Sequence, residues 1–509
     1  HFQTGLKNLM DRAIISRTEK EAKEHAILQN LDKIFQKIDE LPFDFERRRM
    51  SVIVKDDSNV VSMVTKGALE EMLNISTYVE YRGEMIPLTE DIRQEVLAEV
   101  GQLNRQGLRV LGVGYKSGLR EDYAYAVTDE SDMILTGYLA FLDPPKPSAA
   151  PAIQALLEHG VRTKILTGDN EKVTQAICEK VGLDVEQMLL GADIDQMTDQ
   201  ELAEAVESVA VFAKLSPDQK ARIILQLKKN GHAVGYMGDG INDAPSMKVA
   251  DVGISVDTAV DIAKETADVI LLDKDLMVLE TGIVEGRKVY ANMTKYIKMT
   301  VSSNFGNIFS LLVASIFLPF LPMAPVHLIV LNLVYDLSCV ALPFDNVDQD
   351  FLKQPHTWEA KSITRFMVWM GPISSIFDIL TFIFLYFIIV PLVTGYHYVH
   401  GSESALQFII LFQTGWFIES MWSQTMVIHM LRTAKVPFVQ SRPAWLVILT
   451  TLVAAIFVTS LPYGPLVNIL RLAPLGLPYF LFLTCIIFLY MFSVTVIKKC
   501  YIRKYKEWL

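Results

Sequence analysis

The sequence has 509 residues, a length that predicts two to four domains. Its formal net charge of −11 argues against nucleic acid as a partner, because phosphate-binding surfaces need an excess of Lys and Arg. The four cysteines have no paired spacing, so we expect neither a zinc site nor a disulfide framework, and a reducing compartment for the soluble part. Hydrophobic residues make up 51% of the chain and crowd into its second half, and the polar first residues show no signal peptide.

Residues 1–137 predict a mixed α+β domain. The apolar spacing of residues 1–40 is typical of helices. Two short strands follow, at residues 50–54 and 60–65. The Asp-Asp-Ser-Asn turn between these strands predicts a hairpin.

The ends of this hairpin carry side chains that could bind a nucleotide. Phe43 and Arg48 precede it, and Lys66 and Gly67 follow it. An aromatic ring can stack on a purine, and cations can neutralise phosphates. From the residues alone, a core phenylalanine and a solvated charged edge are the commoner interpretation. The sequence contains no G-x-x-x-x-G-K-[ST] motif, so a P-loop is not expected.

Residues 138–285 predict a doubly wound, mostly parallel sheet. A strand at residues 138–142 ends at Asp143, which begins a proline-rich boundary. Strands and helices alternate after it, and the ligands of such a sheet bind beyond the carboxyl ends of its strands. The further predicted elements are strands 163–166, 210–213, 233–237, 252–256 and 269–272 and helices 149–159 and 171–181.

An acidic loop between one of these strands and the next helix predicts a magnesium site. It reads Gly-Asp-Gly-Ile-Asn-Asp-Ala-Pro, and it places Asp239 four residues before Asp243, with Asn242 beside it. Mg²⁺ binds one or two carboxylates and keeps positions for water and phosphate. The alternative is an acidic turn that is shaped by its Asn and Gly residues. The position of the loop at the end of a strand makes this alternative the weaker interpretation.

Two further strand ends carry polar side chains. Thr167, Gly168 and Asp169 follow one predicted strand, and Lys220 lies after a Ser-Pro helix start. Alone, the first group could be a helix cap and the second a surface lysine. Together with the acidic loop, they supply a hydroxyl, a cation and a metal-binding pair, which are the parts that stabilise a transferring phosphoryl group.

Residues 286–509 predict an all-α membrane domain of six helices. Each of six apolar stretches has about the ~20 residues that a helix needs to cross the hydrocarbon layer. They are residues 297–318, 326–344, 366–391, 405–430, 444–463 and 477–497. Lys and Arg gather before the first, after the second, after the fourth and after the last, and such loops stay in the cytoplasm. We therefore expect a multi-pass protein in contact with membrane lipid, with both chain ends and the soluble domains cytoplasmic.

Polar residues inside these stretches predict an ion path. Asn304 and Asn307 share a helix face in the first stretch, and Asn332 and Asp336 share one in the second. Glu419 lies in the fourth. Most intramembrane Ser and Asn make hydrogen bonds between helices, and this is the alternative for each of them. For the two carboxyl groups we favour a role in ion binding, because a buried charge in lipid is costly.

These motifs resemble the haloacid-dehalogenase phosphotransfer fold in the form that P-type ATPases use. Thr167-Gly168-Asp169, Lys220 and the acidic loop are similar to three of the four motifs of that fold, and Asp143-Pro144-Pro145 is similar to the hinge into the nucleotide domain. The resemblance implies ATP and Mg²⁺ as cofactors. It assigns ATP contacts to Phe43, Arg48, Lys66, Gly67 and Arg109, and catalytic roles to Thr167, Gly168, Asp169, Lys220, Asn242 and Asp243.

One departure from the family is large. The phosphorylated Asp of the family belongs to an Asp-Lys-Thr-Gly-Thr string, which does not occur here. In the family it lies upstream, after four membrane spans and an actuator domain. The chain therefore resembles the C-terminal part of a pump, whose partner is the missing N-terminal part. By itself, we expect it to form no aspartyl phosphate.

The resemblance also implies a transported cation. Asn304, Asn307, Asn332 and Asp336 fall on positions that supply its ligands in P-type ATPases. Amide-rich coordination suits a cation that keeps part of its water, which is Mg²⁺ behaviour. The strings around Asn332 and Arg48 resemble those of bacterial magnesium-importing P-type ATPases, which implies a place in the inner membrane. A pump for another cation such as Ca²⁺ or K⁺, or for lipid, and a membrane-tethered phosphatase or non-pumping scaffold remain the alternatives.

Overall fold

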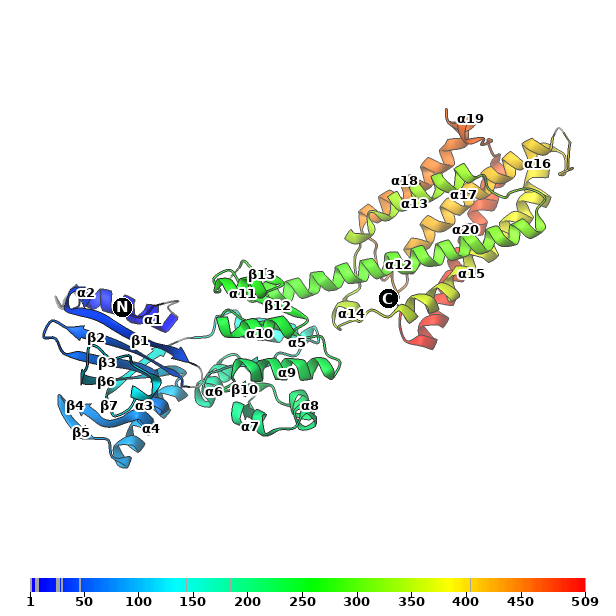
Figure 1. Cartoon of the computed structure of the whole chain (residues 1–509). Helices are drawn as coiled ribbons and strands as arrows, with labels where there is room; N and C mark the ends of the chain where they lie inside the picture. Colours follow the sequence, from blue (N-terminus) through cyan, green and yellow to red (C-terminus); the bar gives the residue numbers. More distant parts are fainter. Residues whose placement is uncertain are drawn as a thin grey trace. The chain divides into compact units, whose positions relative to one another are not determined.

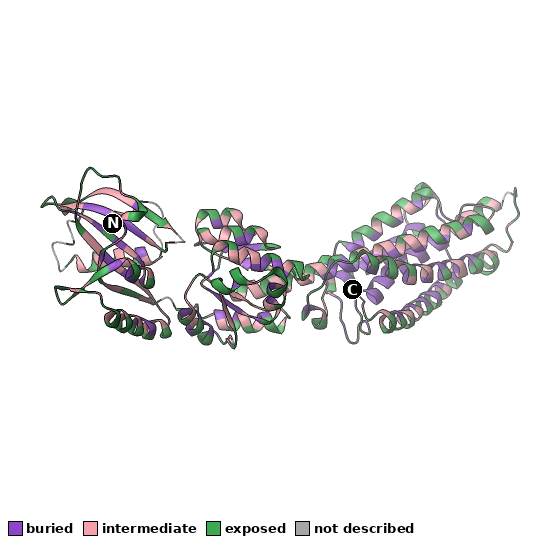
Figure 2. Cartoon of the chain, turned by 60° about the horizontal axis from the view of Figure 1, so that its bottom comes forward, coloured by how far each residue is buried: buried purple, intermediate pink, exposed green. Residues whose placement is uncertain are grey.

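The structure is a computed structural model that describes residues 2–4, 9–23, 28, 31–44, 47–142, 144–183, 185–273, 275–402 and 404–508 (Figure 1). It divides into two compact units. The first consists of His1–Leu157 and Arg162–Leu279, and the second of Glu158–Val161 and Glu280–Leu509. Within each unit the buried residues lie inside the sheets and between the helices, as Figure 2 shows in purple.

A seven-stranded sheet with the order β1-β2-β3-β6-β7-β4-β5 forms the first part of unit 1. Its strands are β1 (Phe35–Asp44), β2 (Arg49–Asp56), β3 (Val61–Ala68), β4 (Ser76–Tyr81), β5 (Glu84–Pro87), β6 (Leu108–Leu119) and β7 (Met133–Leu142). The helices of this part are α1 (Leu9–Glu21), α2 (Leu31–Ile34), α3 (Leu69–Ile75) and α4 (Glu90–Arg105). Met72 and Val100 attach α3 and α4 to the sheet through a shared apolar core.

The predicted hairpin is confirmed, because β2 and β3 pair antiparallel from Arg49 opposite Gly67 onward. The helix predicted up to residue 40 is wrong in its last part. Residues from Phe35 form β1, which pairs with β2, and Pro42 could not continue a helix. The strand predicted at residues 138–142 begins earlier, at Met133, and it pairs antiparallel with β6 as part of this sheet.

The rest of unit 1 alternates helices with parallel strands, as the sequence predicts. Two three-stranded parallel sheets form, with the orders β8-β10-β9 and β11-β12-β13. The strands are β8 (Ile165–Leu166), β9 (Met188–Leu190), β10 (Val211–Ala213), β11 (Gly235–Met237), β12 (Val252–Val256) and β13 (Val269–Leu271). The helices are α5 (Ala149–Glu158), α6 (Glu171–Lys180), α7 (Gly191–Gln196), α8 (Asp199–Ser208), α9 (Pro217–Lys229), α10 (Ala244–Val249) and α11 (Asp261–Thr266).

Helix α9 belongs to the cores of both sheets. Ser216 caps its start, since the Ser216 hydroxyl accepts from the Gln219 N–H at 3.3 Å and the Gln219 side chain accepts from the Ser216 N–H at 2.8 Å. Ile223 packs in the core of the first sheet and Ile224 in that of the second. Leu166 of β8 packs against both cores. The two sheets are therefore neighbours, with α9 fixed across them.

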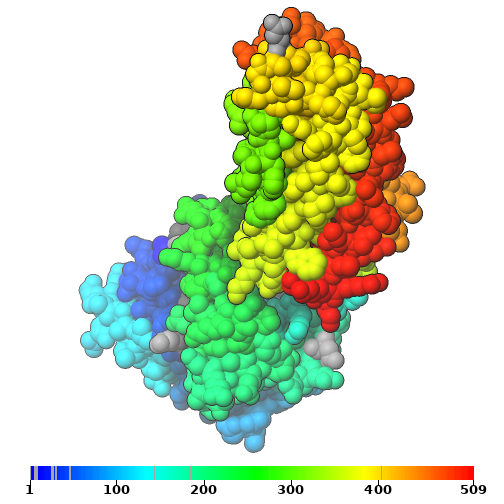
Figure 3. Space-filling model, turned by 90° about the vertical axis from the view of Figure 1, so that its right-hand side faces the viewer, coloured from blue at the N-terminus to red at the C-terminus, as the bar shows by residue number. Residues whose placement is uncertain are grey.

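Unit 2 is a helical bundle. Its helices are α12 (Met277–Phe317, continuing from unit 1), α13 (Pro325–Cys339), α14 (Gln349–Leu352), α15 (Ala360–Phe384), α16 (Val390–Thr394), α17 (Ala405–Leu431), α18 (Trp445–Ser460), α19 (Val467–Leu470) and α20 (Leu477–Tyr505). A π-helical turn, Leu385–Ile389, joins α15 to α16. In the space-filling view α15 and α20, in yellow and red, lie side by side on one face (Figure 3).

In the described part of the chain, five helices are long and apolar enough to cross a membrane, where the sequence predicts six. They correspond to α12, to α13 with the turn after it, to α15 with α16, to α18 with the turn after it, and to α20. The remaining predicted span forms α17, which has 27 residues but carries many polar side chains. Most of its residues are buried by the neighbouring helices, so its surface faces protein rather than lipid.

Segments that the sequence predicts on the cytoplasmic side meet at one end of this bundle. The Lys295 ammonium on α12 lies 2.9 Å from the Asp345 carboxylate, and the Arg432 guanidinium after α17 lies 2.7 Å from it. Lys298 donates to the backbone carbonyl of Trp508 at 3.0 Å. Asp345 thus neutralises Lys295 and Arg432, and the Trp508 carbonyl accepts from Lys298, within the fold.

Candidate functional site

The acidic loop and Lys220 form one charged cluster. Lys220, in the first turn of α9, places its ammonium 2.9 Å from Asp243 Oδ1. The Tyr236 hydroxyl donates to the same oxygen at 2.7 Å, and the Gly240 N–H donates to Asp243 Oδ2 at 3.2 Å. Burial would raise the pKa of Asp243, but Lys220 and these hydrogen bonds outweigh it and hold that pKa below its ordinary value. Asp243 is therefore a carboxylate at neutral pH.

The same loop fits a magnesium ion at Asp239. Asp239 lies two residues after the last residue of β11, and it is exposed. A Cβ at Gly238 would lie 2.4 Å from Asp243 Cβ, so glycine is required for the loop to close this tightly. Within the described residues, no group of three or more His, Cys, Asp or Glu side chains gathers as a metal centre. One or two carboxylates with remaining water positions are the donor set that Mg²⁺ accepts.

Thr167, Gly168 and Asp169 form a loop at the carboxyl end of β8. The Thr167 hydroxyl accepts from the Asp169 N–H at 3.1 Å. The Leu215 N–H donates to the Thr167 carbonyl at 3.0 Å, and the Lys214 N–H donates to the Asp169 carbonyl at 2.8 Å. The loop is thereby fastened to the segment that leads into α9, the helix of Lys220. The loop after β8 is thus tied to the segment before α9, and the loop after β11 is tied to α9 itself through Lys220.

Arg109, which the resemblance assigns to ATP, pairs with this loop in the structure. Its guanidinium lies 2.6 Å from Asp169 Oδ2, and both side chains are about one-third exposed, at 33% and 28%. Arg109 comes from β6 of the seven-stranded sheet, so this ion pair links the two parts of unit 1. Asp143, in the predicted hinge, lies outside the described residues.

The hairpin ends differ in how exposed their side chains are. Phe43 is 50% exposed, and Arg48 is exposed with a left-handed φ of 51°. Lys66 is engaged, because its ammonium donates to the Asp11 carboxylate on α1 and to Gln3 Oε1 at 3.0 Å. Gly67 lies where a Cβ would approach Arg49 Cβ to 2.5 Å.

The sequence analysis missed the residue that pairs with the two arginines on either side of Arg48. Glu130 is buried, and its carboxylate accepts from Arg47 at 2.6 Å and from Arg49 at 2.8 Å. The Ser51 hydroxyl also donates to it at 2.7 Å. Arg47 and Arg49 are therefore structural, which leaves Arg48 as the exposed arginine of this segment. No local pattern predicts Glu130, since it lies about 80 residues along the chain from its partners.

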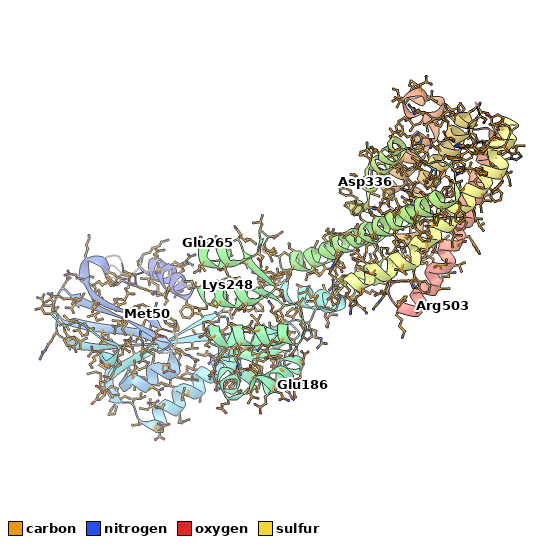
Figure 4. The ribbon with its side chains drawn as sticks, turned by 45° about the vertical axis from the view of Figure 1, so that its right-hand side comes forward. Met50, Glu186, Lys248, Glu265, Asp336 and Arg503 are labelled. Carbon is orange, nitrogen blue, oxygen red and sulfur yellow. The ribbon has the colours of Figure 1, made fainter. Side chains whose placement is uncertain are left out.

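The predicted ion-binding residues fall into two groups. Asn304 on α12 and Asn332 and Asp336 on α13 are exposed in this chain, and Figure 4 shows Asp336 at the edge of the bundle. Asn307 is half-buried and accepts from Gln424 of α17 at 3.3 Å. Glu419 is 1% exposed. The structure thus brings Asn307 and Glu419 into the bundle but leaves the other three on an open face.

A carboxyl group that the sequence analysis did not single out lies beside Glu419. Asp378, on α15, is 4% exposed, and its side chain hydrogen-bonds that of Glu419. The sequence did contain a signal for Asp378, because it is an Asp inside a predicted membrane helix. Ionisable residues in membrane helices are rare and functional.

Comparison with protein families finds a match in part of each unit. The family description "P-type ATPase, cytoplasmic domain N" matches residues 4–148, and "Cation transporting ATPase, C-terminus" matches residues 320–500. The "Magnesium-transporting ATPase, P-type 1" of Salmonella typhimurium (strain 14028s / SGSC 2262) is 50% identical over 505 residues, which cover 99% of this chain and 54% of that protein. The chain belongs to the P-type ATPases.

Two further relatives also match this chain over part of their own length. The "Magnesium-transporting ATPase, P-type 1" of Escherichia coli (strain K12) is 49% identical over 505 residues, 99% of this chain and 54% of the relative. The "Calcium-transporting ATPase" of Bacillus subtilis (strain 168) is 32% identical over 361 residues, 69% of this chain and 41% of the relative. The chain spans about half the length of the curated relatives that it matches.

Proposed function

We propose that this chain is the nucleotide-binding and ion-conducting part of a P-type ATPase that imports Mg²⁺ across the bacterial inner membrane. The observation that carries the proposal is the 50% identity to a magnesium-transporting ATPase along 99% of the chain. The paired Lys220 and Asp243 and the helical bundle support it, because they supply a phosphate-handling site and a membrane path in one polypeptide.

In this proposal the cytoplasmic site handles a phosphoryl group. Lys220 and Thr167 stabilise its oxygens, and Asp243 holds Lys220 in place. Asp239 and Asn242 are the candidates for holding Mg²⁺ and its water, and the bound ion would supply positive charge against the phosphate. Phe43 and Arg48 are the exposed candidates for stacking and for pairing with the ATP phosphates.

The phosphorylated Asp would come from a segment upstream of this sequence. In the described part of the chain, β8 pairs only with β10 and β11 only with β12, so each sheet ends in an unpaired edge. These edges belong to neighbouring sheets that share α9 and Leu166. Unpaired edges recruit further strands. We propose that an upstream strand pairs here and completes one doubly wound, haloacid-dehalogenase-like sheet.

The membrane arrangement follows from charge and burial. The lysines and arginines gathered around Asp345 mark the cytoplasmic end of the bundle, in agreement with positive loops staying inside. We propose that α17 is a sixth span, surrounded by protein and therefore able to carry polar residues. The open face with Asn304 and Asp336 would receive the upstream spans, which would close the ion site.

Transport assays with the complete protein test the function. In proteoliposomes that present the cytoplasmic side outward, external ATP is expected to drive ²⁸Mg²⁺ out of the lumen, because an importer moves the ion toward its cytoplasmic side. Ca²⁺ flux without Mg²⁺ flux would replace the proposal with a calcium pump, the function named for the Bacillus relatives. ATP-independent turnover of a phosphate monoester without ion flux would favour the phosphatase alternative.

This chain incubated with [γ-³²P]ATP is expected to acquire no acid-stable label, because it has no Asp-Lys-Thr-Gly-Thr string. Co-expression with the upstream half should restore the label on that half. Label on this chain alone would contradict the assignment of the phosphorylated Asp to the upstream segment.

Asp336→Asn in the complete protein is expected to weaken the apparent Mg²⁺ affinity of ATP hydrolysis by about tenfold or more, since a carboxylate ligand is lost. ATP binding should stay unchanged, because Asp336 lies on a membrane helix. Mg²⁺-dependent hydrolysis and ATP-analogue binding measure the two effects. Unchanged stimulation by Mg²⁺ would remove Asp336 from the ion path.

Asp11→Asn is expected to tighten the binding of an ATP analogue to this chain by about two- to fivefold, because a partly exposed ion pair of this kind is worth up to ~1 kcal/mol. The substitution releases Lys66, the candidate phosphate contact, from α1. Fluorescent-nucleotide titration measures the change. Arg17→Ala, which removes an exposed ion pair elsewhere on α1, is the matched control and should have no effect.

A further inference from the structure

A polar cavity lies among α12, α15, α17 and α20. Its volume is about 20 Å³, which is enough for one water or one ion. Side chains with oxygen atoms line much of it: Ser302, Ser303, Asn307, Ser374, Asp378, Ser423, Gln424 and Tyr490. Of the predicted ion-binding residues, Asn307 alone lines this cavity, whereas Asp336 is on the open face of α13.

Asp378 is the acidic residue of this cavity, and hydrogen bonds fix its orientation. The Ser310 hydroxyl donates to Asp378 Oδ2 at 2.6 Å, and the Trp416 indole N–H donates to Oδ1 at 2.9 Å. Glu419 adds a second carboxyl group to this cluster. Among the described residues that line the cavity, none is basic. A buried acidic pair without a cationic side chain needs another source of positive charge.

Two buried oxygens at this place have no hydrogen-bond partner among the described residues. One is the Ser302 hydroxyl, which lines the cavity on a residue that is only 3% exposed. The other is Glu419 Oε2, on the side chain that hydrogen-bonds Asp378. Leaving a buried polar atom unpaired is unfavourable, so such atoms call for a ligand, an ion or a water.

We propose that this cavity binds a divalent cation, with Asp378 as the charged ligand and Ser302 among the neutral ones. Carboxylate, amide and hydroxyl oxygens are the donors that hard divalent cations prefer. The site lies between helices α12, α15, α17 and α20, apart from the Asn304, Asn332 and Asp336 set. Its binding is a property of this chain, and its use in transport rests on the proposed function.

Mn²⁺ is a suitable probe, because the site contains its own reporter. Trp416 touches Asp378, so Mn²⁺ bound there quenches the Trp416 fluorescence. The signal is the difference in Mn²⁺ quenching between the detergent-solubilised chain and its Trp416→Phe variant. A saturable difference that competing Mg²⁺ reverses is the expected result.

Three variants locate the ion. Asp378→Asn should weaken the Mn²⁺ affinity by about 100-fold or more, since the charged ligand is lost. Ser302→Ala should weaken it by about two- to tenfold without lowering the thermal midpoint, because the Ser302 hydroxyl has no hydrogen bond to lose. Asp350→Asn makes the same chemical change at an exposed ion pair with Lys435, and it should leave the Trp416 signal unaltered.

Equal quenching in the chain and in both the Asp378→Asn and Ser302→Ala variants would overturn the proposal and mean that the cavity holds water only. If Asp378→Asn fails to fold, Ser302→Ala decides by itself. Absence of Mg²⁺ transport by the complete protein would refute the proposed function but would leave Mn²⁺ binding at Asp378 standing, so the two failures are distinguishable.

Discussion

Asp345→Ala is expected to destabilise the helical unit by about 3–5 kcal/mol, because it leaves two buried cations without their counter-charge. Lys295 and Arg432 both contact Asp345 Oδ2, and both side chains are 1% exposed. The Ala444 N–H also loses its acceptor, Asp345 Oδ1. Thermal unfolding of the detergent-solubilised chain, followed by the fluorescence of its tryptophans, measures the effect.

Asp350→Ala is the matched control for this change. Its partner, Lys435, lies 2.8 Å away, but the two side chains are 39% and 71% exposed. Exposed ion pairs contribute ~0–1 kcal/mol, so the control should unfold close to the parent chain. Equal midpoints for the two variants would show that the pairing of Asp345 is not what stabilises this end of the bundle.

The pH dependence of the parent chain follows from the same carboxylate. Burial would raise the pKa of Asp345, but Lys295 and Arg432 outweigh it and hold that pKa below its ordinary value. A carboxyl whose pKa is lower in the folded state stabilises the fold above its unfolded-state pKa, near 4, and this stabilisation is lost as the pH falls through the folded-state pKa. The Asp345→Ala variant should therefore lose less stability than the parent on acidification below about pH 4.

Lys220→Ala in the complete protein is expected to lower the rate of ATP hydrolysis by about 10²–10³-fold, which is the usual cost of removing one preorganised group that stabilises transition-state charge. The side chains of Lys220 and Asp243 are 11% and 14% exposed, so water cannot replace the ammonium well. Nucleotide affinity should change little, because the candidate adenine and phosphate contacts lie on the seven-stranded sheet. Steady-state hydrolysis and nucleotide titration separate the two quantities.

Lys228→Ala provides the control on the same helix. Lys228 lies two turns further along α9 and pairs with Asp251 at 2.9 Å, with side-chain exposures of 32% and 40%. Its removal is expected to leave hydrolysis within about twofold of the parent, because an exposed ion pair away from the strand ends contributes little. A loss as large as that of Lys220→Ala would mean that α9 is disturbed as a whole and would contradict a specific role for Lys220.

The sequence by itself determined the hairpin, the alternation of strands and helices, the acidic loop after β11 and the positions of the long apolar helices. These features depend on spacing and turn chemistry within a few residues, which a single sequence displays directly. The error over residues 35–40 arose because the pairing of β1 with β2 overrides a weak helical pattern.

Only the tertiary structure decided which polar groups meet. It paired Lys66 with Asp11, Arg109 with Asp169, and Asp378 with Glu419, and it placed Asp336 on an open face. The partners in these pairs lie tens of residues apart, and no periodicity or turn signal links them. Their pairing follows from how helices and sheets pack, and burial then makes each pairing matter, because a polar group removed from water must find its partner within the protein.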